Sequence, residues 1–299
     1  MPAVQAHGVL LLDKPAGYSS TQALARAKRF LQAPKAGHTG TLDPFATGLL
    51  PLVFGEATKF ARFALDATKG YRATLRLGLE TTTGDTEGIE LARVPVEVDV
   101  GLIDEVLVRF TGVRDQIPPM HSAVRVGGKR LYELAREGVE IERAPRRIEI
   151  MSLAREAFAG DELVISVTCS KGTYVRTLAM ELGRALGCGA YLTALRRTAV
   201  GQFRLGDTTT LEVLEAEGPV AGRARLLPVE ILVQDLPRCD FPAVEALRFT
   251  QGQEIPDPHP GPEVAVFGPE GRFLGVAGAA GGRLVPLRLM ATDSSREAP

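Results

Sequence analysis

The sequence is poor in the residues that build metal sites and disulfide frameworks. Among its 299 residues it has three cysteines, four histidines and no tryptophan. The spacing of the cysteines matches no metal-binding pattern, and a small odd number of them argues against a disulfide framework. We therefore predict neither a metal site nor a disulfide-stabilised fold.

Long apolar runs are missing as well, since no stretch approaches the roughly 20 residues that span a bilayer. The first eight residues lack the charged and apolar regions of a signal peptide. We expect a cytoplasmic protein that does not act at a membrane. Hydrophobic residues make up 45% of the chain, which is ordinary for a globular protein, and the length allows two domains.

The net charge of −1 conceals a strong segregation of charge along the chain. Residues 14–76 have ten basic and three acidic residues, whereas residues 77–115 have three basic and nine acidic ones. Residues 161–204 are basic again, and residues 205–263 are acidic. Such segregation indicates a face that meets phosphate. Without a motif, solvated helix faces would explain it equally well.

Apolar periodicity predicts the secondary structure along the chain. Strands are expected at 9–12, 69–79, 147–157, 162–170, 199–205, 263–267, 273–277 and 284–289, and helices at 102–110, 131–136 and 244–249. Two more helices are expected where apolar residues recur at helical spacing, from Ala23 to Leu31 and from Leu178 to Leu186. The change of texture after residue 233 predicts a small β-rich second domain of about fifty residues.

One carboxylate, Asp43, lies in a loop rich in glycine and bounded by prolines, residues 36–51. Gly40 and Gly48 allow positive φ or the close approach of another backbone. A plainer interpretation makes Asp43 the N-cap of a short apolar helix with Pro44 at its first position. The two are compatible, because a cap residue also holds its carboxylate rigidly.

Residues 116–147 form a second distinctive block. Its two consecutive prolines prevent regular structure at its start, and Gly127-Gly128-Lys129-Arg130 makes a flexible basic tip. A long insertion of this kind indicates a mobile element that closes over a ligand. An ordinary surface excursion is the alternative.

Several runs together resemble the TruB family of pseudouridine synthases, over about residues 8–203. They are Gly37-His38-Thr39-Gly40-Thr41-Leu42-Asp43-Pro44-Phe45-Ala46-Thr47-Gly48-Leu49-Leu50, Lys69-Gly70-Tyr71, Gln116-Ile117-Pro118-Pro119-Met120-His121-Ser122-Ala123, Ser170-Lys171-Gly172-Thr173-Tyr174-Val175-Arg176-Thr177-Leu178 and Leu195-Arg196-Arg197-Thr198. The Asp43 run alone is highly specific, and all five occur in the family's order.

The resemblance implies an α+β pseudouridine synthase fold with a central mixed, mostly antiparallel sheet and flanking helices. The catalytic domain would span residues 1–236, with residues 116–147 as an RNA-binding thumb. Residues 237–291 would form a small β-rich, PUA-like domain, on a weaker match, and residues 292–299 a disordered tail.

The resemblance further implies that a monomer isomerises uridine 55 in the T loop of transfer RNA, without a cofactor, after flipping the base out of its stack. Asp43 would be the catalytic carboxylate, a group that can attach to carbon and leave again. Arg176 would pair with it, and Tyr71 would stack on the target base. Whether Asp43 attacks the base, attacks the ribose or aids proton loss stays open.

The same comparison extends to the RNA contacts. His38 would contact RNA beside the target, and Tyr174 and Leu195 would line the uridine pocket. Lys14, Lys129 and Arg130 would contact phosphates. By position alone, an inward tyrosine such as Tyr71 is more often a core residue, and Tyr174 and Leu195 could also be core residues. His121 departs from the family, where many members have tyrosine, and we expect little consequence.

Two other functions remain open at this point. A guide-RNA-dependent synthase of the dyskerin type shares these motifs, although it usually has a longer N-terminal extension and a fuller PUA domain. A tRNA-binding or tRNA-folding chaperone needs no catalytic residues, and the presence of Asp43, Tyr71 and Arg176 argues against a purely binding role.

Overall fold

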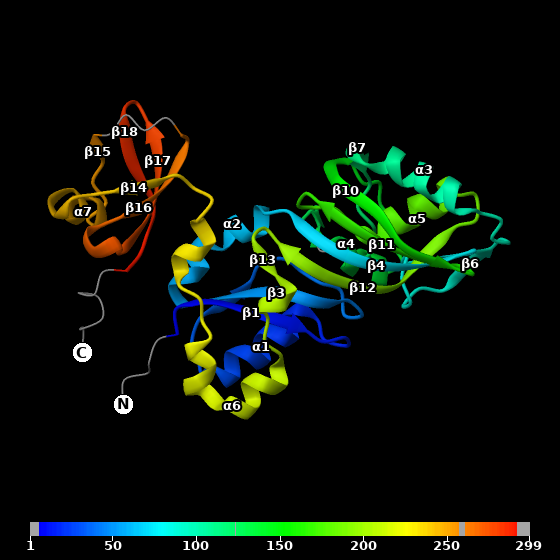
Figure 1. Cartoon of the computed structure of the whole chain (residues 1–299), viewed down its shortest axis with the longest axis horizontal. Helices are drawn as coiled ribbons and strands as arrows, with labels where there is room; N and C mark the ends of the chain where they lie inside the picture. Colours follow the sequence, from blue (N-terminus) through cyan, green and yellow to red (C-terminus); the bar gives the residue numbers. More distant parts are fainter. Residues whose placement is uncertain (1–5, 123, 257–260, 292–299) are drawn as a thin grey trace.

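The structure is a computed structural model that describes residues 6–122, 124–256 and 261–291, so the predicted tail at 292–299 lies outside it (Figure 1). Its larger sheet has nine strands, ordered β1-β3-β12-β4-β11-β10-β7, with β2 paired to β3 and β13 to β12. These are β1 (Gly8–Lys14), β2 (Ala36–His38), β3 (Thr47–Phe54), β4 (Lys69–Leu77), β7 (Gly112–Gln116), β10 (Arg146–Ala159), β11 (Glu162–Cys169), β12 (Ala190–Val200) and β13 (Phe203–Arg204). All pairs in this sheet are antiparallel except β3 with β12, which confirms the mixed, mostly antiparallel sheet.

Seven α-helices lie in the described part of the chain: α1 (Ser20–Phe30), α2 (Ala61–Asp66), α3 (Val100–Phe110), α4 (Leu131–Arg136), α5 (Val175–Ala185), α6 (Leu211–Ala224) and α7 (Ala243–Thr250). The described residues also form four short 3-10 helices: η1 (Gly55–Phe60), η2 (Leu205–Asp207), η3 (Val229–Val233) and η4 (Pro269–Gly271). The start of α1 follows from its sequence, because Ser19 and Gln22 form a capping box. No helix of the described residues is long and apolar enough to cross a membrane.

Strands β1 and β3 are buried on both faces, which explains their continuous apolar runs. Leu10 and Leu12 pack on one side with α1 and α6, and Val9 and Leu11 pack on the other with the η1 and η3 segments. This half of the large sheet is therefore covered on both faces.

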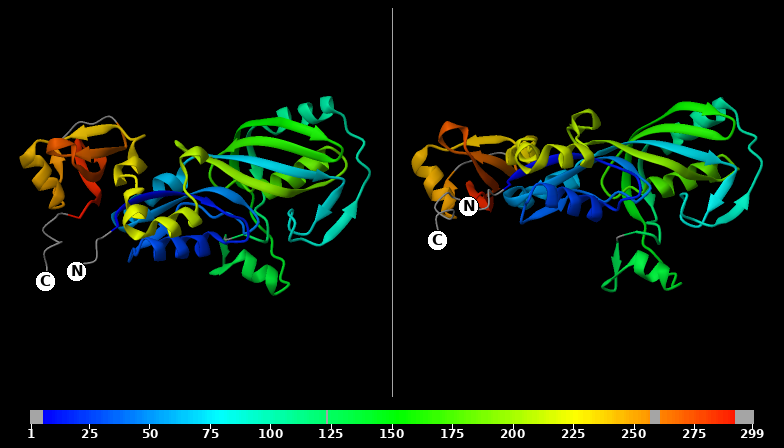
Figure 2. Two further views of the ribbon diagram at one scale, coloured as in Figure 1. Left: turned by 60° about the horizontal axis from the view of Figure 1, so that its bottom comes forward. Right: turned by 90° about the horizontal axis from the view of Figure 1, so that it is seen from below.

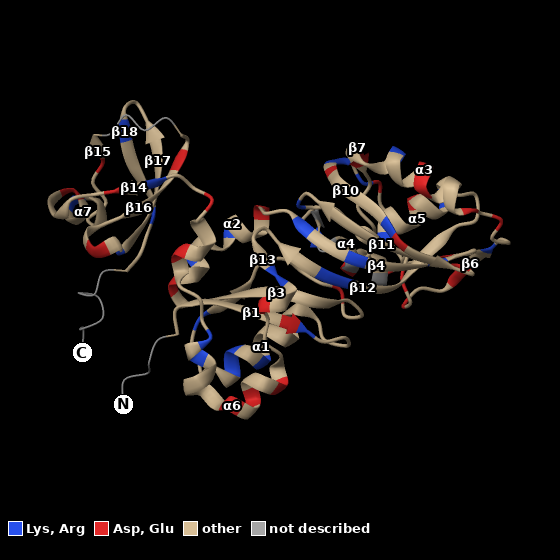
Figure 3. Cartoon of the chain, in the orientation of Figure 1, with Lys and Arg blue, Asp and Glu red and all other residues tan. Residues whose placement is uncertain are grey.

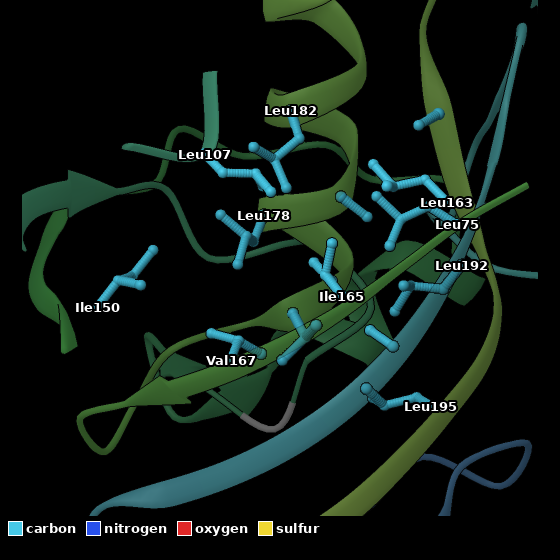
Figure 4. Packing of buried hydrophobic residues seen from close by; sticks show 14 of the residues in the cluster. Leu75, Leu107, Ile150, Leu163, Ile165, Val167, Leu178, Leu182, Leu192 and Leu195 are labelled. Carbon is cyan, nitrogen blue, oxygen red and sulfur yellow. The ribbon is translucent and has the colours of Figure 1, made fainter. Parts of the chain in front are cut away.

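The other half of the sheet packs one face against α3 and α5 (Figure 4). On β4, Ala73 and Leu75 point into this core, and Tyr71 lies at its edge. Leu178 and Leu182 of α5 meet them from above. The alternation predicted for β4 is therefore confirmed, and it aims Tyr71 toward the α5 side of the sheet.

Two small hairpins extend from this body. One joins β5 (Leu79–Thr81) to β6 (Glu90–Arg93), and the other joins β8 (Arg125–Val126) to β9 (Lys129–Arg130). The second belongs to the insertion between β7 and β10 and projects away from the sheet together with α4 (Figure 2).

A separate five-stranded sheet follows η3, in the order β14-β16-β17-β18-β15. Its strands are β14 (Arg238–Asp240), β15 (Ile255–Pro256), β16 (Glu263–Phe267), β17 (Phe273–Ala280) and β18 (Arg283–Leu289). This sheet and α7 confirm the predicted β-rich C-terminal unit.

Two local predictions are wrong. No helix starts at Asp43: the chain bends from Thr41 to Ala46 and enters β3, whose apolar residues pair along β1 instead of forming a helix face. The strand predicted at 199–205 is interrupted by a turn at Gly201, and most of its pairing belongs to the long strand β12, which periodicity missed.

Candidate active site

The loop that carries Asp43 is held from both sides. Its neighbours Leu42 and Ala46 are buried in the core beneath α5. The Ser20 hydroxyl at the start of α1 accepts from the Leu42 N–H at 2.8 Å and donates to the Leu42 carbonyl at 3.1 Å. The Gly17 N–H donates to the Pro44 carbonyl at 2.8 Å. Asp43 is thus fixed by its flanking residues and not by a helix cap.

Arg176, in the first turn of α5, forms a bidentate ion pair with the Asp43 carboxylate. Its Nε lies 2.9 Å from one Asp43 oxygen and its Nη2 lies 3.3 Å from the other. The rest of the guanidinium donates to the Thr83 carbonyl at 3.2 Å and to the His121 carbonyl at 2.7 Å. The Arg176 side chain is 5% exposed and that of Asp43 is 34% exposed, so the pair presents the carboxylate and hides the cation.

A second carboxylate, Asp85, lies on the same arginine. Its oxygen is 3.5 Å from Arg176 Nε, and its side chain is 4% exposed. Burial raises the pKa of the Asp43 carboxyl, the Arg176 charge opposes this, and the Asp85 charge adds to the rise. The buried Arg176 therefore pairs with two carboxylates, and only that of Asp43 reaches solvent.

Tyr71 lies next to this pair on β4 and is half-buried. Burial raises the pKa of its hydroxyl, while its hydrogen-bond partner Arg197 lowers it. Arg197 itself is fully buried on β12, and its Nε donates to the Leu49 carbonyl at 2.6 Å. Its Nη2 reaches the Gly40 carbonyl at 3.3 Å, so this arginine ties the Asp43 loop to β12.

His38, at the end of β2, is half-buried, and its Nδ1 has no hydrogen-bond partner among the described residues. Burial lowers the pKa of its imidazole, and the charge of Arg197 lowers it further. Both effects favour the neutral imidazole, and the unpartnered Nδ1 is itself buried beside the Arg197 guanidinium.

Leu195 and Tyr174 complete the predicted set. Leu195, on β12, is buried in the core that also holds Leu42 and Ala46. Tyr174 directly precedes α5 and is half-buried. The fold therefore brings Asp43, Tyr71, Tyr174, Arg176 and Leu195 to one region on the α5 side of the sheet.

Lys14 does not fit the predicted phosphate contact. It is fully buried, and its Nζ donates to the carbonyls of Pro15, Tyr18 and Pro44 at 2.9, 2.6 and 3.4 Å. Burial lowers the pKa of this ammonium to about 8. Lys14 instead supports the loop next to Asp43, because three carbonyls already occupy its donors.

The other predicted phosphate contacts lie on the insertion. Lys129 is exposed at the tip of the β8–β9 hairpin and forms an ion pair with Glu137 at 3.3 Å. The structure describes the backbone of Arg130 but not its side chain. Figure 3 shows Lys and Arg positions along β4 and β12 of the large sheet. Arg72 and Arg76 of β4 have the opposite parity to Tyr71, so they face the other side of the sheet, where they pair with Glu156 and Asp161.

The sequence alone did not single out two residues of this site. Asp85 lies in a polar turn with no distinctive spacing, and only its burial beside Arg176 marks it. Arg197 lies in one of the family-like runs, but its full burial and its contact with Tyr71 depend on β12, the strand that periodicity missed.

The arrangement suits covalent or acid–base chemistry by one oriented carboxylate next to an aromatic ring. Among the residues that the structure describes, no group of three or more His, Cys, Asp or Glu side chains could hold a metal ion.

Three family models match the chain in succession. Residues 28–175 match the N-terminal domain of the TruB family pseudouridylate synthases. Residues 176–234 match the C-terminal domain of tRNA pseudouridylate synthase B, and residues 237–290 match the C-terminal domain of pseudouridine synthase II TruB.

Relatives of similar length share about half of the sequence. The tRNA pseudouridine synthase B of Azoarcus sp. is 53% identical over 97% of this chain and 96% of its own length. That of Thiobacillus denitrificans is also 53% identical, over 97% of this chain and 98% of its own length.

Among solved structures, one in a Cbf5-Nop10-Gar1 complex has a TM-score of 0.74 at 25% identity, covering 96% of this chain and 84% of that one. The likeness to this solved structure confirms the pseudouridine synthase fold. The sequence identity of about 50% over nearly the whole chain shows the family. The chain belongs to the TruB family of pseudouridylate synthases, which are isomerases.

Proposed function

We propose that this protein converts uridine 55 in the T loop of transfer RNA to pseudouridine. The observation that carries the proposal is the Asp43 carboxylate, held by a buried arginine fork and open to solvent on its other side. The relatives named tRNA pseudouridine synthase B support transfer RNA as the substrate class. The T stem-loop and action as a monomer stay predictions.

In the proposed reaction the glycosidic bond from N1 to C1′ breaks, the uracil turns, and a bond from C5 to C1′ forms. The C5 proton leaves and N1 gains a proton, so atoms balance without oxidant or reductant. Asp43 assists bond exchange by attaching to the base or ribose, or by taking a ribose proton. Arg176 orients the carboxylate and stabilises its ionised form before it reacts.

The surrounding residues would bind and shape the substrate. Tyr71 stacks on the flipped base, and Leu195 and Tyr174 form the apolar walls of its pocket. His38 contacts RNA beside the target. Unstacking the base costs a few kcal/mol, which contacts of this kind and phosphate contacts by Lys129 and Arg130 would offset.

The test is tritium release from T-stem-loop RNA labelled at uridine C5. We expect the purified protein to release tritium unaided, and Asp43→Asn to lower the rate roughly 10³-fold or more while RNA affinity is retained. Full activity of Asp43→Asn would contradict the catalytic assignment. As a control for the modified position, an RNA with the target uridine replaced by cytidine should release no tritium.

A guide-RNA-dependent synthase is the second candidate, because structural relatives occur in an H/ACA RNP bound to a substrate RNA and in a Cbf5-Nop10-Gar1 complex. The same assay separates the two. Activity only after the addition of guide RNA would favour this second function, and unaided activity would exclude it.

A further inference from the structure

The insertion between β7 and β10 is tied to the start of α5 through Gln116, the last residue of β7. This side chain is only 2% exposed. Its Nε2 donates to the Tyr174 carbonyl at 3.2 Å, and its Oε1 accepts from the Tyr174 N–H at 2.8 Å. A carboxamide offers a donor and an acceptor side by side, so it pairs with a backbone residue as a neighbouring strand would.

The same insertion makes a second contact, through the His121 carbonyl, with Arg176 Nη2 at 2.7 Å. Between the two contacts lie Pro118 and Pro119, whose rings fix φ. The Pro118 carbonyl also accepts from Arg143 Nη1 at 3.2 Å, on the returning limb of the insertion. The segment that joins the contacts is therefore stiff, and a displacement of the insertion reaches α5 instead of being absorbed by a flexible loop.

The anchored residue occupies a sensitive place. Tyr174 is the N-cap of α5, and its side chain makes no capping hydrogen bond. Its carbonyl accepts the first helical bond, from the Leu178 N–H at 3.0 Å. Arg176 follows two residues later. The hydrogen bonds between Gln116 and Tyr174 therefore fix the position of the Arg176 backbone, from which its side chain extends to Asp43.

We propose that Gln116 is a positioning residue: it fixes the start of α5 against the root of the insertion and thereby sets the geometry of the Arg176–Asp43 pair. This inference rests on the proposed function, in which that pair acts on uridine. It assigns to the insertion a role in aligning the carboxylate, in addition to binding RNA.

The first test is Gln116→Met, which keeps the length and removes both hydrogen bonds. We expect single-turnover conversion of T-stem-loop RNA at saturating enzyme to slow roughly 10- to 100-fold, since misplacement of a reacting group by about 1 Å costs about that much. RNA affinity should stay within about twofold of the unchanged protein's, because Gln116 faces α5.

Gln202→Met is the matched control. Gln202 Nε2 donates to the Ile231 carbonyl at 2.6 Å, a bond of the same kind beyond β12 that does not involve α5. Its single-turnover rate should equal that of the unchanged protein. Equal slowing of both variants, in proportion to a shared loss of folded protein, would overturn the positioning role.

Gln116→Glu supplies a readout that a merely structural role would not move. Its carboxylate still accepts from the Tyr174 N–H but repels the Tyr174 carbonyl, and protonation restores a donor. The rate relative to the unchanged protein should therefore recover as the pH falls. A ratio that is constant with pH would contradict the pairing as the cause.

The double variant Gln116→Met with Arg176→Lys completes the test. If Gln116 acts through Arg176, the Gln116 change should slow the Arg176→Lys protein less than twofold further. Full additivity would overturn the inference.

Unaided conversion by the unchanged protein together with a full rate in Gln116→Met would overturn this inference alone. No conversion by the unchanged protein would overturn the proposed function and this inference with it.

Discussion

At the scale of single residues, opposed effects act on the Asp43 carboxyl group. Burial among Leu42, Ala46 and the start of α5 raises its pKa, and the nearby charge of Asp85 raises it further. The Arg176 fork lowers it and keeps the carboxylate oriented. The net shift is upward, so this acid takes up a proton at a higher pH than an ordinary aspartate does.

A pH dependence of the reaction follows. The single-turnover rate should fall as the pH drops through a midpoint above the ordinary aspartate range of about 4, because protonated Asp43 cannot act as a nucleophile or base. Asp85→Asn removes a neighbouring negative charge and should move the midpoint to lower pH. The measurement is conversion of T-stem-loop RNA across pH 4.5–8, in buffers of constant ionic strength.

Asp104→Asn is the control for this change, since Asp104 lies on α3 and pairs with Arg155. Its pH profile should coincide with that of the unchanged protein. A midpoint that stays in place in Asp85→Asn would show that Asp85 does not act on Asp43 through its charge.

Lys14 gives a second prediction, about stability. Burial lowers the pKa of its ammonium to about 8, whereas a lysine in the unfolded chain titrates near 10.4. Between these values the unfolded chain binds more protons, so this group makes stability rise with pH by up to about 1.4 kcal/mol per pH unit. Lys14→Met should lose that contribution.

Denaturant unfolding of both proteins between pH 7 and 10 measures it. The free energy of unfolding of the unchanged protein should rise relative to that of Lys14→Met above pH 8. Parallel curves would mean that the folded chain does not shield this ammonium from water.

At the scale of elements, the site depends on the parallel pairing of β3 with β12. At this junction Gly48 has φ +102°, and a Cβ there would lie 2.3 Å from the Arg197 carbonyl oxygen. The close approach joins the strand that follows Asp43 to the strand that carries Leu195 and Arg197. Glycine is needed here both for its φ and for the space.

We therefore expect Gly48→Ala to destabilise the protein more than Gly112→Ala. Gly112 has a similar φ of +106° but open space around its Cβ position. The strained φ alone should cost about 1–3 kcal/mol in either variant. The clash at Gly48 should add about 1–3 kcal/mol. Chemical denaturation compares them, and equal losses would rule out the clash.

The same junction shows where periodicity failed. The apolar run after Asp43 fits a short helix as well as a strand, and only its pairing with β1 decides for the strand. β12 alternates poorly because two register shifts interrupt its pairing with β4. By contrast, α1, β4, β10 and β11 were predicted correctly, because apolar periodicity acts locally.

At the scale of the whole molecule, the C-terminal sheet packs on the η1 and α2 segments beside the large sheet through an apolar contact. Phe273 and Val276 of β17 share a core with Phe60 and Val9 of the large-sheet half, and the Phe60 and Phe273 rings lie 5.2 Å apart. An ion pair between Arg62 and Glu263 borders this contact at 2.7 Å. Its side chains are partly exposed, so we expect the apolar contact to dominate.

Phe273→Ala should thus cost about 3–5 kcal/mol and expose the connection at residues 234–237 to proteases. Arg62→Ala should cost at most about 1 kcal/mol and leave that connection protected. Limited proteolysis and thermal unfolding measure both. Equal protection in the two variants would show that the sheets are held together elsewhere.

By itself, the sequence determined the chemistry at hand: a carboxylate in a glycine-rich loop, an arginine and a tyrosine in specific runs, and an alternation that puts Tyr71 on the inward face of its strand. Only the tertiary structure decided which charged groups lie next to one another. It buried Lys14 against carbonyls and placed Asp85 on Arg176. Burial and pairing depend on residues distant in the chain, which no local pattern encodes.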